Sequence, residues 1–322
     1  MRCAVAAPAR TGIVDHALLP FCAFGFSRNC QDGIDVFVQL AAGDFRLILP
    51  HRPVSLPPTD AKPSDRITDR LPGQPLAADI LRLESIEPQT IEEMYRLFAI
   101  GYEDIDETVF RKDLSNKTHV MVLRDSQGEL RGFTTAVVWE FLDATRPIRL
   151  LFSGDTMVHP SLWGDRTFLT AWLEMAGAAY AHASESPLYW LLLSMSPRTY
   201  RTLPLFFRHY YPEASNDEDL ERIADSVGTN LFAGRYDASR RLVLSGHLTG
   251  RLQADLAQVP QKDRRRADVS FFLARNPSYK NGDEMICLAR LNPENIRPSL
   301  RRYFLRGTER KELFDQATGR IG

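Results

Sequence analysis

The order of elements between residues 149 and 183 constrains the fold more than any other feature of the sequence. An apolar run at residues 150–158, typical of a strand, is stopped by Pro160, and a short loop with Gly164 leads into a long alanine-rich helix. A strand that passes so directly into a helix places unpaired backbone N–H groups and the positive end of a helix dipole beside the strand end. Because such a position attracts phosphate groups, the segment predicts a phosphate-binding loop.

The composition argues against several classes of protein. The chain has 322 residues, 44% of them hydrophobic and 25% charged, and a net charge of −1. A chain of this length can bury a full core, and its balanced charge does not indicate binding to DNA or to an anionic membrane. Pro8, Arg10 and Asp15 interrupt the first apolar stretch, and no window approaches 18 uninterrupted apolar residues. We therefore expect a cytoplasmic protein without a transmembrane helix.

The cysteines predict neither a metal site nor a disulfide framework. Cys3, Cys22, Cys30 and Cys287 form no CxxC pair, and no histidine lies at metal-ligand spacing from them. We expect free thiols in a reducing compartment and no bound metal.

Residues 1–75 are predicted to form an N-terminal arm and a linker. The strand-like runs at 35–40 and 45–49 are joined by AAGD, which predicts a small hairpin or an arm packed on another part of the chain. Residues 50–75 contain seven prolines among polar residues, a density that excludes regular structure. The main domain boundary is therefore expected at about residue 75.

From residue 79 onward, strands and helices alternate. The turn DSQG at 125–128 joins two strand-like runs as a hairpin. Hydrophobic periodicity predicts strands at 80–83, 119–124, 131–141, 149–158 and 188–193, and helices at 88–100, 107–114, 167–183 and 196–211, the last interrupted at Pro204. The element order is β–α–α–β–β–β–α–β–α.

This order, with the V-x-P sequence at 158–160 and with Gly164, resembles the GNAT (N-acetyltransferase-like) acyltransferase superfamily over residues 79 to about 212. The resemblance implies an α/β fold with a mixed central sheet flanked by helices. It also implies a closing hairpin, for which we predict strands at 269–275 and 285–291. A helical insertion precedes the hairpin, with helices near 217–226 and 248–258. The expected domains are an arm and linker at 1–75, a GNAT-like core at 76–212, and the insertion, hairpin and basic tail at 213–322.

The resemblance implies an enzyme, an N-acyltransferase that moves an acyl group from a thioester donor directly to an amine of a small molecule. In the superfamily, the loop after strand four carries Q/R-x-x-G-x-G/A, and its glycines let backbone amides close on the pyrophosphate of CoA. In this sequence Gly164 matches an often-seen glycine. Trp163 replaces the leading Arg or Gln, and Arg166 and Phe168 replace the two motif glycines.

The altered loop leaves the donor open. Arg166 could bind phosphate in bidentate fashion and retain acyl-CoA as the co-substrate. Alternatively, the acyl group comes from an acyl carrier protein, or the site takes no acyl donor. Asp165 and Ser196 also fit helix N-caps. The donor-binding residues that the resemblance implies are Met157, Val158, Trp163, Gly164, Asp165, Arg166, Thr167 and Ser196.

Acyl transfer to an amine needs a base that takes a proton from the ammonium group. Superfamily bases are usually carboxylates on or near strand four, which implies Asp155, within SGDT, or Glu140, near the end of the preceding strand. Desolvation of Glu140 among its apolar neighbours would raise its pKa toward a useful range. Asp155 could instead be a buried bulge carboxylate, and Glu140 could face outward. His159 is a further candidate near neutral pH, although loop histidines usually face solvent.

The leaving thiolate needs an acid. In the superfamily this is often a tyrosine on the helix after strand five, which implies Tyr200, with Tyr210 and Tyr211 as alternates. Each of these side chains could instead pack in the core. Ser194 and Ser196 end strand five, where relatives place a polar residue that contacts the donor.

Two further features concern partners. Aromatic residues are frequent in the second half of the core, and any that line the site would favour an acceptor or acyl chain that is apolar and larger than acetyl. Residues 262–266 (KDRRR), with Arg297, Arg301 and Arg302, form a basic region that is either solvated charge or a docking surface for an acidic carrier protein. We expect a small-molecule amine as the acceptor and neither nucleic acid nor membrane as a partner.

Three functions stay open on the sequence alone. The first is transfer from acyl-CoA to a small-molecule amine. The second is an N-acyl amino acid or acyl-homoserine-lactone type synthase, which shares the fold and takes its acyl group from acyl carrier protein. The third is a catalytically silent GNAT-like module that binds a ligand or a partner protein.

Overall fold

The computed structural model divides into two compact units, residues 1–34 and 35–322, and everything described below lies in the second. The described residues are 36–40, 43–48, 76–144, 146–182, 185–215, 217–245, 250–314 and 318–321. The proline-rich segment predicted to be a linker lies outside them. The domain boundaries at residues 75 and 212 stay predictions.

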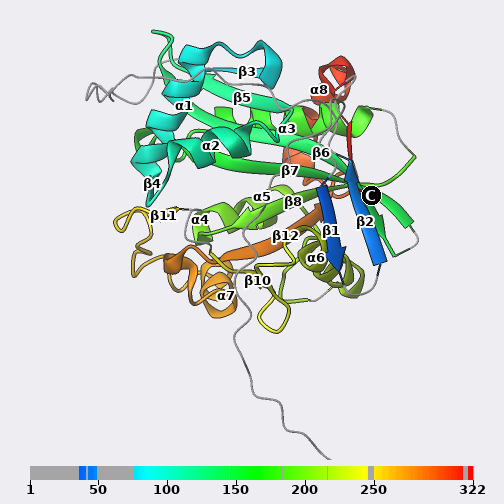
Figure 1. Ribbon diagram of the computed structural model, residues 1–322. Helices are drawn as coiled ribbons and strands as arrows, with labels where there is room; N and C mark the ends of the chain where they lie inside the picture. Colours follow the sequence, from blue (N-terminus) through cyan, green and yellow to red (C-terminus); the bar gives the residue numbers. More distant parts are fainter. Residues whose placement is uncertain are drawn as a thin grey trace, which may run out of the picture. The chain divides into compact units, whose positions relative to one another are not determined.

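A mixed β-sheet forms the centre of this unit (Figure 1). The order across it is β3–β5–β6–β7–β8–β12–β10–β9, and the β7–β8 pair within this series is parallel. Two more strands reach β6 through β13, which pairs with β6 in parallel. The strand bounds are β1 Val36–Leu40, β2 Gly43–Ile48, β3 Ala77–Arg82, β5 His119–Arg124, β6 Leu130–Asp143, β7 Arg146–Val158, β8 Leu188–Ser194, β9 Tyr236–Asp237, β10 Leu242–Val243, β12 Glu284–Arg290 and β13 Thr318–Ile321.

Helices cover both faces of the sheet, as the α/β prediction requires. Because neighbouring residues of a strand point to opposite faces, the buried clusters identify the covering helices. On one face, α1 and α2 cover β5, β6 and β7, and α6 covers β7, β8 and β12. On the other face lie α3, α5, α7 and α8. The helix bounds are α1 Pro88–Gly101, α2 Glu107–Leu114, α3 Thr167–Ala181, α4 Pro197–Tyr200, α5 Thr202–Phe206, α6 Glu218–Leu231, α7 Ala267–Arg275 and α8 Pro298–Thr308.

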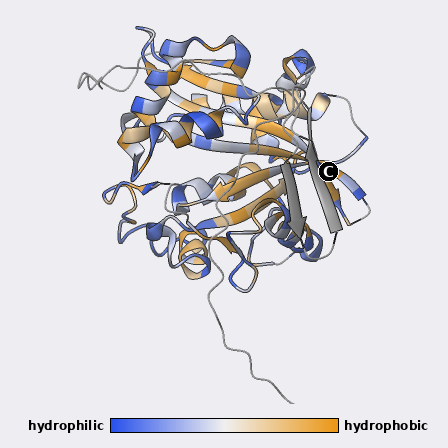
Figure 2. Ribbon diagram, viewed as in Figure 1, coloured by the Kyte–Doolittle hydropathy of each residue, from blue (hydrophilic) through white to orange (hydrophobic). Residues whose placement is uncertain are grey.

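Local sequence signals explain where the helices begin and which face each one buries. Pro88 opens α1, and Ile91, Met94 and Phe98 follow at helical spacing on its buried side. The Asp106 carboxylate accepts the Val109 N–H at 2.9 Å and caps α2. Figure 2 shows hydrophobic residues running along β8 and β12, which are covered on both faces. Across the described residues, no helix combines the length and the apolar character that crossing a membrane requires.

The elements expected for the core are confirmed, with small shifts of their ends. The predicted hairpin near residues 35–49 is also confirmed, since β1 and β2 pair antiparallel. The helix predicted at 196–211 is shorter and divides at Arg201, between α4 and α5. Pro204 falls in the first turn of α5, where a missing N–H removes no helical hydrogen bond.

The predicted closing hairpin is wrong in its first half. Residues 269–275 belong to α7, where Val269 and Phe272 are buried three positions apart and Asp268 lies in the first turn. β-branched and aromatic residues there imitate a strand, but their spacing fits a helix. The second half is confirmed as β12, which pairs antiparallel with β8 and β10.

The two helices predicted in the insertion have different outcomes. The helix near 217–226 is confirmed as α6. The prediction at 248–258 is wrong over its described part, residues 250–258, which form the short strand β11 (Arg251–Leu252) and turns.

Two glycines allow α3 and α8 to pack backbone against backbone. A Cβ added at Gly177 would overlap the carbonyl oxygen of Phe304, and one added at Gly307 would overlap the carbonyl oxygen of Glu174. Arg306 forms an ion pair with Glu174 beside this contact. Any larger residue at either glycine must push the helices apart.

We expect Gly177→Ala to lower the free energy of unfolding by about 1–3 kcal/mol, because the methyl group overpacks a tight interface. Denaturant unfolding at constant pH measures the change. Gly234→Ala is the matched control, since a Cβ added there meets no atom within 4 Å. Equal midpoints for the two variants would contradict the close α3–α8 contact.

Candidate active site

The strands β7 and β8 separate partway along their length. They pair in parallel from Arg149↔Leu188 to Phe152↔Leu191, after which β7 continues to Val158 and β8 to Ser194 (Figure 1). Beyond the last pair, β8 keeps β12 as a neighbour, while β7 keeps β6. We call residues 153–158 of β7 and 192–194 of β8 the β7–β8 fork. In the described part of the chain, the β8-facing edge of β7 has no strand partner along this fork.

A β-bulge in β7 accompanies the separation. Between the pairs Phe133↔Met157 and Thr135↔Gly154, β7 has one more residue than β6. Asp155 lies in this bulge with a φ of 42°, a conformation that costs a non-glycine residue about 1–3 kcal/mol. Bulges bend a strand and re-aim its side chains, so this one turns β7 at the level of Asp155.

Two threonine side chains of β6 hold the bulge. The Thr135 hydroxyl donates to the Gly154 carbonyl at 3.0 Å, and the Thr134 and Thr156 hydroxyls lie 2.7 Å apart. Thr135 Oγ1 also lies 3.3 Å from Asp155 Oδ2, within hydrogen-bond distance. The strained backbone is therefore fixed by buried hydrogen bonds from the neighbouring strand.

Asp155 is a largely buried carboxyl group with a perturbed pKa. Its side chain is 18% exposed, and Lys117 Nζ lies 3.5 Å from its Oδ2. Burial raises the pKa of Asp155 to about 7; Lys117 opposes the rise, and the nearby carboxylate of Asp113 adds to it. Such a group exchanges its proton near neutral pH.

Lys117 links Asp155 to Asp113. Its side chain is 2% exposed and is paired with both carboxylates. Burial acts to lower the pKa of Lys117, but the two carboxylates outweigh it and raise that pKa. The ammonium group thus stays charged and holds Asp155 in place.

A second perturbed carboxyl group, Glu284, lies at the start of β12. Met285 pairs with Ser194, which lies three residues beyond Leu191, so Glu284 lies four residues beyond the last β7–β8 pair, whereas Asp155 lies three residues beyond it. Ile286 packs in the cluster under α6, and Glu284, two residues earlier, has the same orientation on the strand. Burial raises the pKa of Glu284 to about 7; Arg235, 3.6 Å away, opposes the rise, and Asp155 contributes to it.

Tyr102 is the third group at the fork. Its hydroxyl lies 3.5 Å from the carbonyl oxygen of Thr156, next to Asp155. Burial, with Glu284 and Asp155, raises the pKa of Tyr102, so its proton is held firmly.

The inserted segment fixes the position of Tyr102. Tyr102–Glu103, which is β4, pairs antiparallel with β11. Arg251 Nε donates to Glu103 at 2.9 Å, and the Gln253 N–H donates to the Gly101 carbonyl at 2.9 Å. Neither Tyr102 nor Glu284 could be predicted from the sequence, because their places depend on pairing between strands that are far apart in the chain.

The loop after β7 differs from a pyrophosphate cradle. Gly164 has a φ of 104° and supplies the turn. The Asp165 carboxylate accepts the Thr167 N–H at 2.7 Å, which is the capping role that the sequence allowed. Trp163 Nε1 donates to the Val158 carbonyl at 3.1 Å, and Arg198 lies over the Trp163 ring at 3.2 Å. The Asp165 carboxylate, bound to the first amide of α3, places a negative charge at the helix N-terminus, which is unfavourable for a pyrophosphate group there.

The other residues predicted to bind the donor differ in burial and in their hydrogen bonds. Met157 is buried in the cluster under α1, and Arg166 is exposed at the start of α3. The Ser196 hydroxyl accepts the Thr199 N–H at 3.1 Å and caps α4. Ser194 Oγ donates to the Ser196 carbonyl at 3.1 Å.

Tyr200 lies away from the carboxyl groups of the β7–β8 fork. It is 1% exposed, packs in the cluster on the α3 face, and donates its hydroxyl hydrogen to the Pro212 carbonyl at 2.7 Å. Burial raises its pKa. The alternates are also packed: Tyr210 lies against Tyr200, and Tyr211 lies in the cluster under α6. The structure does not bring Tyr200 together with Asp155, and its acid role stays a prediction without geometric support.

Two other base candidates are also separate from Asp155. Glu140 pairs with Arg149 near the other end of β7, six residues before Asp155. At about 3.3 Å per residue this is roughly 20 Å along the strand. His159 Nδ1 accepts the Ser161 N–H at 3.3 Å and begins a short 3-10 turn.

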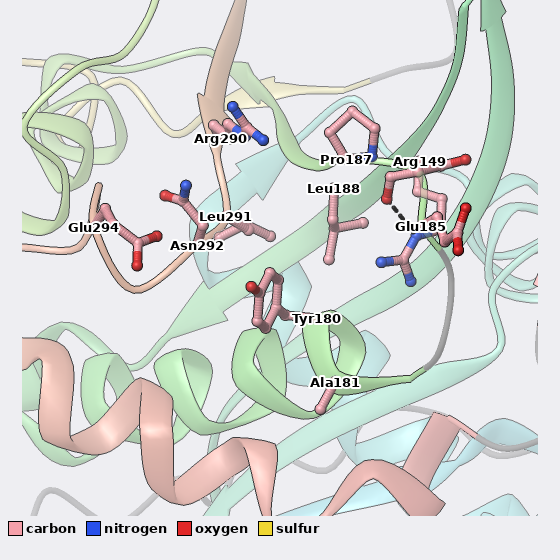
Figure 3. A pocket seen from close by; sticks show the side chains of 11 residues that line it. Arg149, Tyr180, Ala181, Glu185, Pro187, Leu188, Arg290, Leu291, Asn292 and Glu294 are labelled. Atoms are coloured by element: carbon pink, nitrogen blue, oxygen red, sulfur yellow. Dashed lines mark hydrogen bonds between the residues drawn. The ribbon is translucent and has the colours of Figure 1, made fainter.

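A cavity of about 480 Å³ lies at this far end of the sheet (Figure 3). Tyr180 from α3 and Arg290 from β12 line it, together with Arg149. The Arg149 guanidinium donates to the His182 carbonyl at 2.8 Å and to the Ala179 carbonyl at 3.3 Å, so it caps the end of α3. We place the candidate site at the fork instead, because the perturbed carboxyl groups lie there. Among the described residues, no group of three or more His, Cys, Asp or Glu side chains could hold a metal ion.

Comparisons with known proteins add little to this geometry. No protein-family model matches the chain, and no curated protein sequence matches it. A solved structure from Enterococcus faecalis V583, described as a conserved protein of unknown function and a probable N-acyltransferase, is similar to part of the chain. It has 13% sequence identity, a TM-score of 0.32 and an alignment that covers 42% of this chain and 33% of that one. The match thus spans a third of that protein, and a likeness this low carries no functional argument.

We expect the stability of the wild type, relative to Asp155→Asn, to fall as pH rises from about 4 to about 7. Unfolded Asp155 releases its proton near the ordinary pKa of 3.8, whereas the folded carboxyl keeps it until about 7. The folded state therefore binds more protons over this interval, and its advantage is full below the lower value and lost above the higher one.

Urea unfolding at several pH values measures this difference. Asp79→Asn, which changes an exposed carboxyl group on β3, is the control and should follow the wild type. Parallel stability curves for wild type and Asp155→Asn would show that Asp155 has no raised pKa.

Proposed function

We propose that the protein is an acyltransferase that moves an acyl group from a thioester to an amine of a small molecule at the β7–β8 fork. The observation that carries the proposal is Asp155, a largely buried carboxyl group with a pKa of about 7, set in a bulge beside a strand edge that has no strand partner in the described part of the chain. An extended arm with amide groups can hydrogen-bond to such an edge as an added strand does. The arm of a pantetheine thioester has this chemistry.

Asp155 is the proposed base. A primary amine is protonated at neutral pH and has no free electron pair until it loses a proton. The Asp155 carboxylate takes that proton, and the nitrogen then attacks the thioester carbonyl carbon. A C–N bond forms, the C–S bond breaks, and the second proton that the nitrogen loses passes to the sulfur, so the products are an amide and a thiol. A base with a pKa near the working pH combines an available carboxylate with enough basicity.

Glu284 and Tyr102 are given supporting roles. Glu284 provides a second carboxyl group, whose pKa Asp155 helps to raise, and this favours an acceptor that arrives as a cation. Tyr102 keeps its proton and lies beside Thr156, so in place of Tyr200 it is the proposed hydrogen-bond donor to the sulfur as the thiolate leaves. Lys117 acts through Asp155 and is a positioning residue.

We expect Asp155→Asn to reduce the rate of amide formation by about 10²–10⁴-fold, because the amide side chain cannot accept the ammonium proton. The assay follows thiol release and amide formation from S-octanoyl-pantetheine with a panel of amino acids, polyamines and amino sugars. Asp79→Asn, which changes an exposed carboxyl group, is the control and should keep the wild-type rate.

The pH profile separates a base from a structural residue. The wild-type rate should rise with an apparent pKa near 7, and the residual rate of Asp155→Asn should lack that step. Absence of amide formation with every amine, or a variant that keeps the wild-type rate and profile, would contradict the proposed function.

A further inference from the structure

A patch of positive charge lies beside the β7–β8 fork. It combines residues from the start of α3, from α4 and from the segment before α7. We call it the basic surface, and its members are Arg166, Arg198, Arg201, Lys262, Arg264, Arg265 and Arg266.

Side-chain contacts join the three segments. Arg198 of α4 lies over the ring of Trp163, in the loop that follows β7, at 3.2 Å. Arg201, which follows α4, pairs with Asp268 of α7 at 3.3 Å, and Arg266 pairs with the same carboxylate at 3.2 Å. The basic surface is therefore one continuous region that adjoins the end of β7.

The charge of this region departs from that of the whole chain. Seven cations stand among three acids, Asp165, Asp263 and Asp268, whereas the chain has a net charge of −1. Burial and the neighbouring Arg201 lower the pKa of Arg198, so like charges are held close together at some cost. A surface of this kind attracts a broad anionic partner.

The placement of positive charge indicates which kind of thioester donor the site takes. The amide of Thr167, at the N-terminus of α3, is bound by Asp165, so the loop places a carboxylate where a nucleotide pyrophosphate would need free N–H groups. The guanidinium groups instead spread over three separate segments around the fork. This distribution suits the face of an acidic protein better than a single pyrophosphate.

We propose that the basic surface docks an acidic carrier protein, which delivers its acyl-phosphopantetheine arm into the β7–β8 fork. The proposal rests on the proposed acyl transfer and specifies the source of the thioester. The arm enters beside Trp163, and the exposed arginines contact carboxylates of the carrier. Such charge pairs act mainly on the rate of association and are weakened by salt.

The test compares three donors that carry the same octanoyl group: an acidic acyl carrier protein, CoA and pantetheine. Binding is measured at about 50 and about 300 mM salt, over which ionic screening rises strongly. We expect the carrier protein to bind at least about tenfold more tightly than octanoyl-pantetheine at low salt, with most of this advantage lost at high salt.

A double charge reversal, Lys262→Glu with Arg265→Glu, tests the surface directly. Both side chains are exposed, and the fork is left unchanged. We expect this variant to weaken carrier binding by about tenfold and to leave octanoyl-pantetheine unaffected. Arg310→Glu with Lys311→Glu changes the net charge equally on exposed residues after α8 and should leave carrier binding unchanged.

The possible results separate the two proposals. If octanoyl-CoA binds as tightly as the carrier, or the carrier gains nothing over octanoyl-pantetheine, the docking proposal is overturned while acyl transfer at the fork stands. Equal weakening by both double variants also overturns it, because the effect then depends on net charge alone. If octanoyl-pantetheine itself neither binds nor reacts, the proposed function fails instead.

Discussion

The bulge of β7 at Gly154–Thr156 is the constraint on which the candidate site depends. One extra residue there bends the strand, and the parallel pairing with β8 ends just before it, at Phe152↔Leu191. Hydroxyl groups of Thr134 and Thr135 hold the unusual backbone from β6. Without the bulge, nothing in the register would stop the pairing of β7 with β8 from continuing to Ser194, the end of β8.

The raised pKa values of the carboxyl groups at the fork arise chiefly from their burial there. Asp155 and Glu284 are withdrawn from water and also oppose each other, and Lys117 and Arg235 compensate only in part. Burying paired charges costs desolvation energy that their attraction seldom recovers in full. Groups kept in such a state, with pKa values near 7, are more typical of chemical function than of stability.

The sequence predicted what depends on local patterns. Hydrophobic periodicity and the positions of proline and glycine predicted the strand at 149–158, the loop at Gly164 and the helix that begins at Thr167. The structure confirms these elements. Asp155 could be proposed because the resemblance to the GNAT superfamily implies a carboxylate base on or near strand four. Glu284 and Tyr102 could not, because only the β12–β8 and β11–β4 pairings bring them to the fork.

The predictions that the structure does not support failed for a similar reason, because tertiary packing decides these features. Residues 269–275 have strand-like composition, but packing of Val269 and Phe272 on one side selects a helix. Tyr200 has the expected distance from β8 in sequence, yet that distance does not say where its hydroxyl points. In the structure the hydroxyl bonds to Pro212 and the ring packs beside Phe272.

The inserted segment also contributes to the site. It supplies Arg235 beside Glu284, and it supplies β11, which pairs with β4 and holds Tyr102 at the fork. The fork is thus bounded by α1 and β4 on one side and by residues of the insertion on the other. This arrangement explains how a segment outside the expected core shapes the same chemistry.

Backbone hydrogen exchange with a bound S-octanoyl-pantetheine analogue would show where the thioester arm lies. If the fork is the acyl-transfer site, exchange slows at residues 153–158 of β7 and 192–194 of β8 and does not change around Tyr180 and Arg290 at the far cavity. Protection at the cavity alone, or equal exchange with and without the analogue, would contradict the assignment of the fork as the acyl-transfer site.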